Sequence, residues 1–242
     1  MLSEFEGLFI KKSKYQDGSF IITVYTKLEG LLPLIFFIKK SYFNNTILVP
    51  FVKVFGFYYK KFLNEVFRIK DLTIQPEYEL INSPAYKQVA FSIIAQIINL
   101  TLPKRKPDLC IYDLLIDIKN IILKNNQSHI TLWILWFLKE FIAKLGINPI
   151  LNFSLNTPYF DISQGKFVCN PSFFSLPFEQ SIEVFNVFSS QNFDDLKNCI
   201  NSSSFFYLLD FFEKYFNVHW NSNLNFQFIK EYIINFDDFY HS

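Results

Sequence analysis

Few residues in this 242-residue chain stand at spacings that would support catalysis. Asp113 and Asp117 lie four positions apart in an apolar run, so a helix would place both carboxylates on one face, where they could hold a divalent metal ion. The same spacing describes a solvated polar stripe opposite Leu114, Leu115 and Ile118, and we favour that interpretation. A metal-dependent nuclease built on the two aspartates is therefore the weakest of the functions considered.

The cysteines and histidines form no recognisable metal or redox motif. Cys110, Cys169 and Cys199 are odd in number and far apart, so we expect small buried apolar residues and not a disulfide framework or a CxxC site. His129 stands where a helix would begin, and no histidine has an HxxxH or HxH partner. With six glycines in the chain, no phosphate loop, dinucleotide fingerprint or serine elbow is present. We expect no enzymatic activity, no metal and no cofactor.

The lysines offer a different chemistry, the binding of a polyanion. Residues 1–70 hold eleven basic side chains against five acidic ones, whereas residues 71–242 hold twelve against seventeen. Many of the first group flank aromatic residues in strand-like runs, and this mixture suits phosphate neutralisation and base stacking. Our candidate nucleic-acid contacts are Lys11, Lys12, Lys14, Lys39, Lys40, Lys53, Lys60, Lys61, Tyr58 and Tyr59. In one continuous strand the two tyrosines would point to opposite faces, so only one of them could join a given stacking surface.

The elements that would position these lysines are short strands. Phe20–Thr26 is β-branched and aromatic and ends in a turn glycine. Thr46–Lys61 reads as a long strand interrupted at Gly56, where we expect a sharp bend or bulge, and Val66–Ile74 reads as another. Such strands within residues 1–78 predict a small closed barrel of the oligonucleotide-binding kind.

Residues 79–242 carry the spacing of helices, so the expected fold class is α+β, with an N-terminal barrel and a mostly helical second domain. Ser83 is a candidate N-cap, with Pro84 at the first helical position. Trp133 and Trp136 are expected in the core. Helices are expected at 84–102, 109–124, 130–145, 177–190, 194–202, 204–217 and 226–236. No apolar run is long enough to span a membrane and the first residues lack a signal-peptide pattern, so we expect a cytoplasmic protein without a membrane partner.

The order of these parts resembles the RecO family of bacterial recombination mediators along almost the whole chain. Gly7, Tyr15, Asp17, Thr26 and Gly30 match the family's opening. Residues 39–59 match a basic stretch that leads to a Leu-x-Pro-Phe strand, and residues 129–149 match a helix that ends in Leu-Gly before a proline. Residues 159–167 match a Tyr-Phe-Asp-x-x-x-Gly-x-Phe element, and residues 206–226 match the closing helix of the family.

The resemblance implies a non-enzymatic protein of DNA repair and recombination. Such a protein binds single- and double-stranded DNA, promotes strand annealing and, with RecR, loads RecA onto DNA coated by single-stranded-DNA-binding protein. The resemblance also implies that the helical domain receives the C-terminal tail of the coating protein, for which Lys104, Arg105 and Lys106 are the candidate residues. The alternative for these three residues is a solvated connector between helices. The alternative is a non-catalytic protein–protein adaptor with weakened or lost DNA binding.

Two departures from the family pattern stand out. Many members carry a four-cysteine zinc element in the helical domain, whereas only Cys169 lies near that place here. The family's Lys-Gly-x-Arg entry to its basic loop is reduced to Lys39 and Lys40. The first departure predicts a protein without zinc, and the second suits the adaptor alternative.

Overall fold

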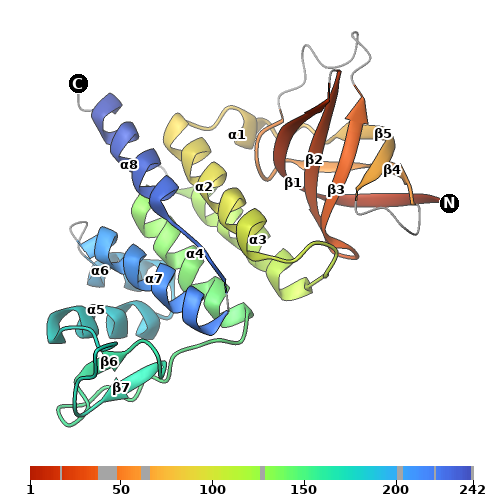
Figure 1. Cartoon of the computed structure of the whole chain (residues 1–242). Coiled ribbons are helices and arrows are strands. Elements are labelled where there is room, and N and C mark those ends of the chain that lie inside the picture. Colours follow the sequence, from red (N-terminus) through yellow and green to blue (C-terminus); the bar gives the residue numbers. More distant parts are fainter. Residues whose placement is uncertain are drawn as a thin grey trace. The chain divides into compact units, whose positions relative to one another are not determined.

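A computed structural model describes most of the chain: residues 1–16, 18–37, 48–60, 66–125, 129–200, 204–220 and 222–240, with side chains as far as residue 234. The chain divides into two compact units, Met1–Ser128 and His129–Ser242. Each unit is described by itself below (Figure 1).

Unit 1 begins with a closed five-stranded β-barrel (Figure 1). The strands are β1 (Leu2–Gln16), β2 (Ser19–Thr26), β3 (Gly30–Phe37), β4 (Lys53–Tyr59) and β5 (Phe67–Ile74). Their order is β1-β2-β3-β5-β4, and β4 pairs with β1 to close the barrel. Every pairing is antiparallel except that of β3 with β5. The predicted α+β class with an N-terminal oligonucleotide-binding-like barrel is therefore confirmed.

Gly30 and Gly56 of the barrel are each required by a close backbone approach. Gly30 ends the β2–β3 turn with φ +63°, and a Cβ there would lie 2.3 Å from the carbonyl oxygen of Lys106. A Cβ on Gly56 would lie 2.1 Å from the carbonyl oxygen of Asp71 on β5. The register shift of the β4–β5 pair falls next to Gly56, between Phe57 and Tyr58. An irregularity was predicted at this point, and the structure confirms it beside the glycine.

Three helices complete unit 1: α1 (Tyr78–Ile81), α2 (Ala85–Thr101) and α3 (Leu109–Lys124). Helix α2 begins after Pro84, and the Ser83 hydroxyl donates to the Leu80 carbonyl, so the predicted Ser83 cap is wrong. Phe51 lies outside β4, has φ +71° and packs on Phe91 of α2 with ring centroids 5.4 Å apart. It is fully buried and therefore belongs to the core.

Unit 2 contains five helices in its described part and a short hairpin. The helices are α4 (Ile130–Lys144), α5 (Phe178–Ser189), α6 (Phe193–Cys199), α7 (Phe205–His219) and α8 (Gln227–Tyr240). They begin and end close to the predicted positions. The hairpin, β6 (Tyr159–Asp161) and β7 (Lys166–Val168), was not predicted as strands. Its buried Phe160 and Phe167 contact each other with centroids 5.0 Å apart and pack in an aromatic core.

Several single-residue predictions can be compared directly with the structure. Trp133 and Trp136 are buried, as predicted, and His129 immediately precedes α4. All three cysteines are exposed, so the prediction that they are buried is wrong. Within the described ranges, no helix combines the length and the apolar character needed to cross a bilayer.

Candidate nucleic-acid interface

A bulge in β1 distributes the first three candidate lysines over two faces of the sheet. The register with β2 shifts between Phe9 and Lys11, and directly opposite residues on neighbouring strands share a face. Lys11 lies opposite Thr23 on the outer face. Lys12 and Lys14 lie opposite Ile22 and Phe20, on the face that continues the barrel interior.

Aromatic rings accompany the two lysines of the interior-side face. The Lys12 ammonium lies 4.2 Å from the centroid of the Phe20 ring. Phe20 is paired with Phe36 on β3, and both rings are only partly buried. Lys11, Lys12 and Lys14 are all exposed. This end of the barrel, which we call the basic end, thus combines cations with ring faces, as single-strand binding requires.

A further cation lies on the outer face, where the candidate set did not include it. Arg68 of β5 is exposed, and its guanidinium lies 4.8 Å from the ring of Phe37, which is 47% exposed. Arg68 stands opposite Ile35 on β3 and Tyr59 on β4, and Tyr59 is 44% exposed. The sequence FRIK alternates apolar and basic residues, and Phe67 and Ile69 are buried. This alternation could have predicted that Arg68 is an exposed cation.

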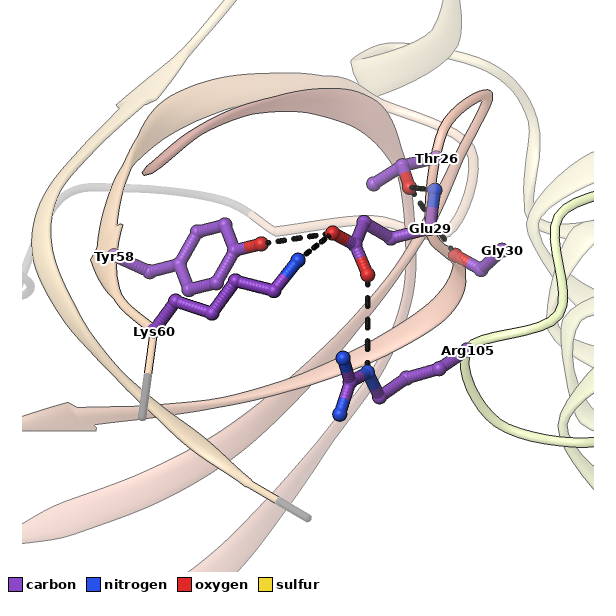
Figure 2. A network of polar contacts seen from close by, with 6 residues as sticks. All are labelled: Thr26, Glu29, Gly30, Tyr58, Lys60 and Arg105. Atoms are coloured by element: carbon purple, nitrogen blue, oxygen red, sulfur yellow. Dashed lines mark hydrogen bonds and ion pairs between the residues drawn. The ribbon is translucent and has the colours of Figure 1, made fainter. Parts of the chain in front are cut away.

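Lys60 and Tyr58 belong instead to a network around Glu29 in the β2–β3 turn. Figure 2 shows the Glu29 carboxylate between Tyr58, Lys60 and Arg105. The Lys60 ammonium donates to Oε1 at 2.5 Å, the Tyr58 hydroxyl donates to the same oxygen at 3.3 Å, and Arg105 Nε lies 3.7 Å from Oε2. The Glu29 amide donates to the Thr26 hydroxyl at 2.9 Å, which fixes the turn that carries the carboxylate.

This network lowers the pKa of the Glu29 carboxyl. Burial acts in the opposite direction and would raise it, but the hydrogen bond and charge of Lys60, the Tyr58 hydroxyl and the charge of Arg105 outweigh burial. The pKa of Lys60 is raised, first by its hydrogen bond to Glu29. Lys60 is thus paired within the barrel.

Tyr58 cannot present its ring to a base. It is 1% exposed, and its ring packs between Phe5 and Phe67, with centroid separations of 6.1 Å and 5.2 Å. Because Tyr58 and Tyr59 alternate along β4, one must point inward. Its inclusion in the stacking set is therefore corrected, and Tyr59 is the tyrosine with an exposed ring.

The other candidates are dispersed. Lys53 is half-buried at the start of β4, where it pairs with Leu8 of β1, and it lines a pocket with Glu4 and Glu6. Lys39, Lys40 and Lys61 lie outside the described residues. The structure therefore brings together Lys11, Lys12 and Lys14 at one end of the barrel, and it separates Lys53 and Lys60 from them.

The candidate tail-binding residues lie in unit 1, in the connection between α2 and α3. The Arg105 amide donates to the Leu31 carbonyl at 2.9 Å, and its guanidinium lies 4.9 Å from the Phe67 ring. The backbone of Lys104 forms an isolated parallel β-bridge with that of Leu31. Lys104, Arg105 and Lys106 are all exposed, and Arg105 also forms an ion pair with Glu29.

Among the described residues, no group of three His, Cys, Asp or Glu side chains comes together as metal ligands. Asp113 and Asp117 are both exposed on α3, opposite buried Leu114 and Leu115. Comparison with known proteins found no matching family model and no matching curated protein.

Proposed function

We propose that the chain binds single-stranded nucleic acid through the basic end of its barrel, as a non-catalytic DNA-binding protein. The observation that supports this most strongly is the closed β1-β2-β3-β5-β4 barrel, whose β1 ends in the exposed Lys11, Lys12 and Lys14 next to Phe20. In barrels of this kind, strands 2 and 3 and the neighbouring loops bind oligonucleotides.

The physical basis of the proposed binding is counterion release supplemented by stacking. Each lysine that neutralises a phosphate releases condensed counterions, which makes the affinity fall steeply with salt. A base stacked on an aromatic ring adds about 1–3 kcal/mol with little sequence preference. Phe37 beside Arg68, together with Tyr59, offers exposed rings next to a cation. The expected preference is therefore for single strands of any sequence.

The resemblance to recombination mediators extends this proposal to a biological role. Binding to single- and double-stranded DNA, strand annealing, cooperation with RecR and loading of RecA onto coated strands are the activities that we propose on that basis. A cytoplasmic location is proposed with them. The barrel and its lysines are compatible with this role, and its support is the order of motifs in the sequence.

The proposal can be tested by fluorescence anisotropy with a labelled oligothymidine of about 30 nucleotides. If about four phosphates are neutralised, raising salt from about 50 mM to about 200 mM should weaken binding ~50-fold. Simultaneous Lys11→Glu, Lys12→Glu and Lys14→Glu substitutions should weaken binding at least about tenfold and flatten the salt dependence.

A matched control changes three exposed lysines elsewhere in the chain: Lys124→Glu, Lys144→Glu and Lys197→Glu. This control variant has the same change in net charge. If binding depends on the basic end, the control should bind the oligonucleotide with nearly the affinity of the original chain. Equal losses in the two triple variants, or no measurable binding at low salt, would refute the proposal. Circular dichroism of each variant checks that the fold is retained.

A further inference from the structure

The outer face of β4 exposes two phenyl rings whose surroundings differ from the basic end. Phe55 and Phe57 point outward on alternate positions of the strand and are 45% and 40% exposed. β4 is paired on both sides, with β1 and with β5, so its backbone offers no edge for another strand. A molecule that covers these rings must therefore lie across the face and contact side chains.

Carboxylates border this pair of rings on both sides. Glu6 and Glu4 of β1 lie opposite Phe55 and Phe57, and Asp71 of β5 lies opposite Phe57. All three acids are exposed. None of them forms an ion pair with another described residue. The face is thus apolar in the middle and negative along its borders with β1 and β5, whereas Lys53 and Arg68 lie toward its two ends.

A pocket of about 670 Å³ continues the acidic border. Glu4 and Glu6 line it together with Lys27 and Leu28 of the β2–β3 turn, and the other lining residues are Phe5, Thr26, Glu29, Lys53, Tyr112, Asp113 and Ile116. All belong to unit 1.

Carboxylates act on the Tyr112 hydroxyl in the wall of this pocket. The pKa of the Tyr112 hydroxyl is raised, first by burial and then by the charges of Glu6, Asp113 and Glu77. Glu29 is already paired with Lys60 and Arg105. Lys27 and Lys53 line the same pocket, and the Lys27 ammonium lies 4.9 Å from the centroid of the Tyr112 ring. Glu4, Glu6 and Asp113 outnumber these two lysines, so the pocket keeps a negative balance that favours a further cation beside Phe5, Leu28 and Ile116.

The charges select the class of occupant. Phosphates of a nucleic acid or of an anionic lipid surface would be repelled by Glu4, Glu6 and Asp71. A symmetric contact with a second copy would bring this acid-bordered face against an identical one, which lacks complementary charge for Glu4, Glu6 and Asp71. A protein segment that carries both apolar and basic side chains satisfies the rings and the carboxylates together.

We propose that this surface, formed by Phe55, Phe57, Glu4, Glu6, Asp71 and the adjoining pocket, docks a basic and apolar segment of a partner protein. Apolar side chains of the segment cover the two rings. A Lys or Arg side chain enters the pocket beside Glu4, Glu6 and Asp113, with its alkyl stem against the apolar lining. The proposal does not depend on nucleic-acid binding, because it uses none of Lys11, Lys12 and Lys14.

The test uses the full chain and two labelled peptides of equal length, one composed of Leu and Lys and the other of Leu and Glu. The Leu–Lys peptide should bind saturably and more weakly at high salt, whereas the Leu–Glu peptide should not bind. Amide shifts in NMR spectra should change on β4 and in the β2–β3 turn. Phe57→Ser should weaken binding at least about tenfold, and Glu4→Gln with Glu6→Gln should weaken it and reduce its salt dependence.

Matched controls come from unit 2, where Phe173 is 96% exposed and Glu179 is also exposed. Phe173→Ser and Glu179→Gln should leave peptide affinity unchanged, and the triple lysine variant described above should bind the peptide normally. Equal affinity of the Phe57→Ser variant and the original chain would overturn the proposal. If the chain self-associates and Phe57→Ser abolishes this, a second copy is the occupant and the proposal is overturned. If Phe57→Ser abolishes oligothymidine binding, the face binds nucleic acid and the proposal is also overturned.

Discussion

Glu29 shows how one carboxylate determines which nearby cations face solvent. Its sequence context, KLEG, predicts a turn, and Gly30 with positive φ confirms that turn. The ion pair with Lys60 could not be predicted, because thirty-one positions separate the two residues. Lys60 and Arg105 are both paired with Glu29, so counting basic residues overestimates the unpaired cations that a polyanion would meet.

At the residue scale, Glu29→Gln should change how stability depends on pH. Because the folded-state pKa of Glu29 is lowered, its contribution is present above the ordinary glutamate pKa and is lost as pH falls through the folded value. The variant should be less stable than the original chain near neutral pH, by less than about 1 kcal/mol since the pair is partly exposed. The difference should disappear in acid. Urea unfolding at neutral pH and at about pH 3 measures both effects; an unchanged difference in acid would contradict them.

Glu77 is a second residue with a measurable role, because it joins β4 to α3. Its carboxylate accepts from the Lys53 amide at 3.0 Å and from the Lys119 ammonium at 2.7 Å, and the Lys119 side chain is 5% exposed. Glu77→Gln would leave a buried cation without its counter-charge and should cost about 2–4 kcal/mol. Glu79→Gln, two positions away and exposed, should cost less than about 0.5 kcal/mol. Equal midpoints of thermal unfolding for the two variants would show that this ion pair contributes nothing.

At the scale of elements, the sequence predicted periodicity well and irregularity poorly. The helix Leu109–Lys124 has the predicted limits, since its apolar spacing is unbroken and Asp108 caps its start. The bulge between Phe9 and Lys11 could not be predicted, because no residue pattern marks it. A strand without the bulge would send Lys12 and Lys14 to the outer face. The sequence therefore predicted that this segment is basic, but it could not predict on which face of the sheet each lysine lies.

The β6–β7 hairpin depends on Asp161, which is fully buried. Burial alone would raise the pKa of this carboxyl, but hydrogen bonds from the Ser163 and Ser172 hydroxyls, the Gln164 amide and the Ser175 hydroxyl lower it to about 2. The carboxylate thus holds together two turns that are about ten residues apart in sequence.

Asp161→Asn should therefore destabilise unit 2 by about 1–3 kcal/mol at neutral pH. Because the folded pKa is depressed, the original chain should lose this advantage as pH falls from about 4 toward 2, and the variant should not. Tryptophan fluorescence during urea unfolding measures the change. Asp194→Asn on the exposed first turn of α6 is the control. Identical unfolding midpoints for the two variants at neutral pH would contradict the assignment.

At the scale of the whole molecule, the two units carry opposite charge. Unit 1 has seventeen basic and eleven acidic residues, and unit 2 has six basic and eleven acidic residues. A domain boundary at residue 78 was predicted from the change in periodicity; the barrel strands end at Ile74, and unit 1 continues through α3. The excess of basic residues is therefore found in unit 1 as a whole and not only in the barrel. Opposite charges on the two units suit a different partner for each unit.

The distribution of tryptophan makes this separation measurable. All three tryptophans, Trp133, Trp136 and Trp220, lie in unit 2. Saturating oligothymidine should leave their emission unchanged while anisotropy of the labelled strand rises, because stacked bases would lie on the barrel of unit 1. Strong quenching in step with the anisotropy change would place the nucleic acid on unit 2 and contradict the proposed function.

The exposed cysteines give the chain built-in attachment points. Cys110 lies on α3 of unit 1, whereas Cys169 follows β7 and Cys199 ends α6 in unit 2. After Cys199→Ser, a thiol-reactive spin label or dye would react once in each unit, and no cysteine would have to be added. A distance distribution between the two labels would then report the spacing of the units in solution, and its change on addition of oligonucleotide or peptide would report their rearrangement.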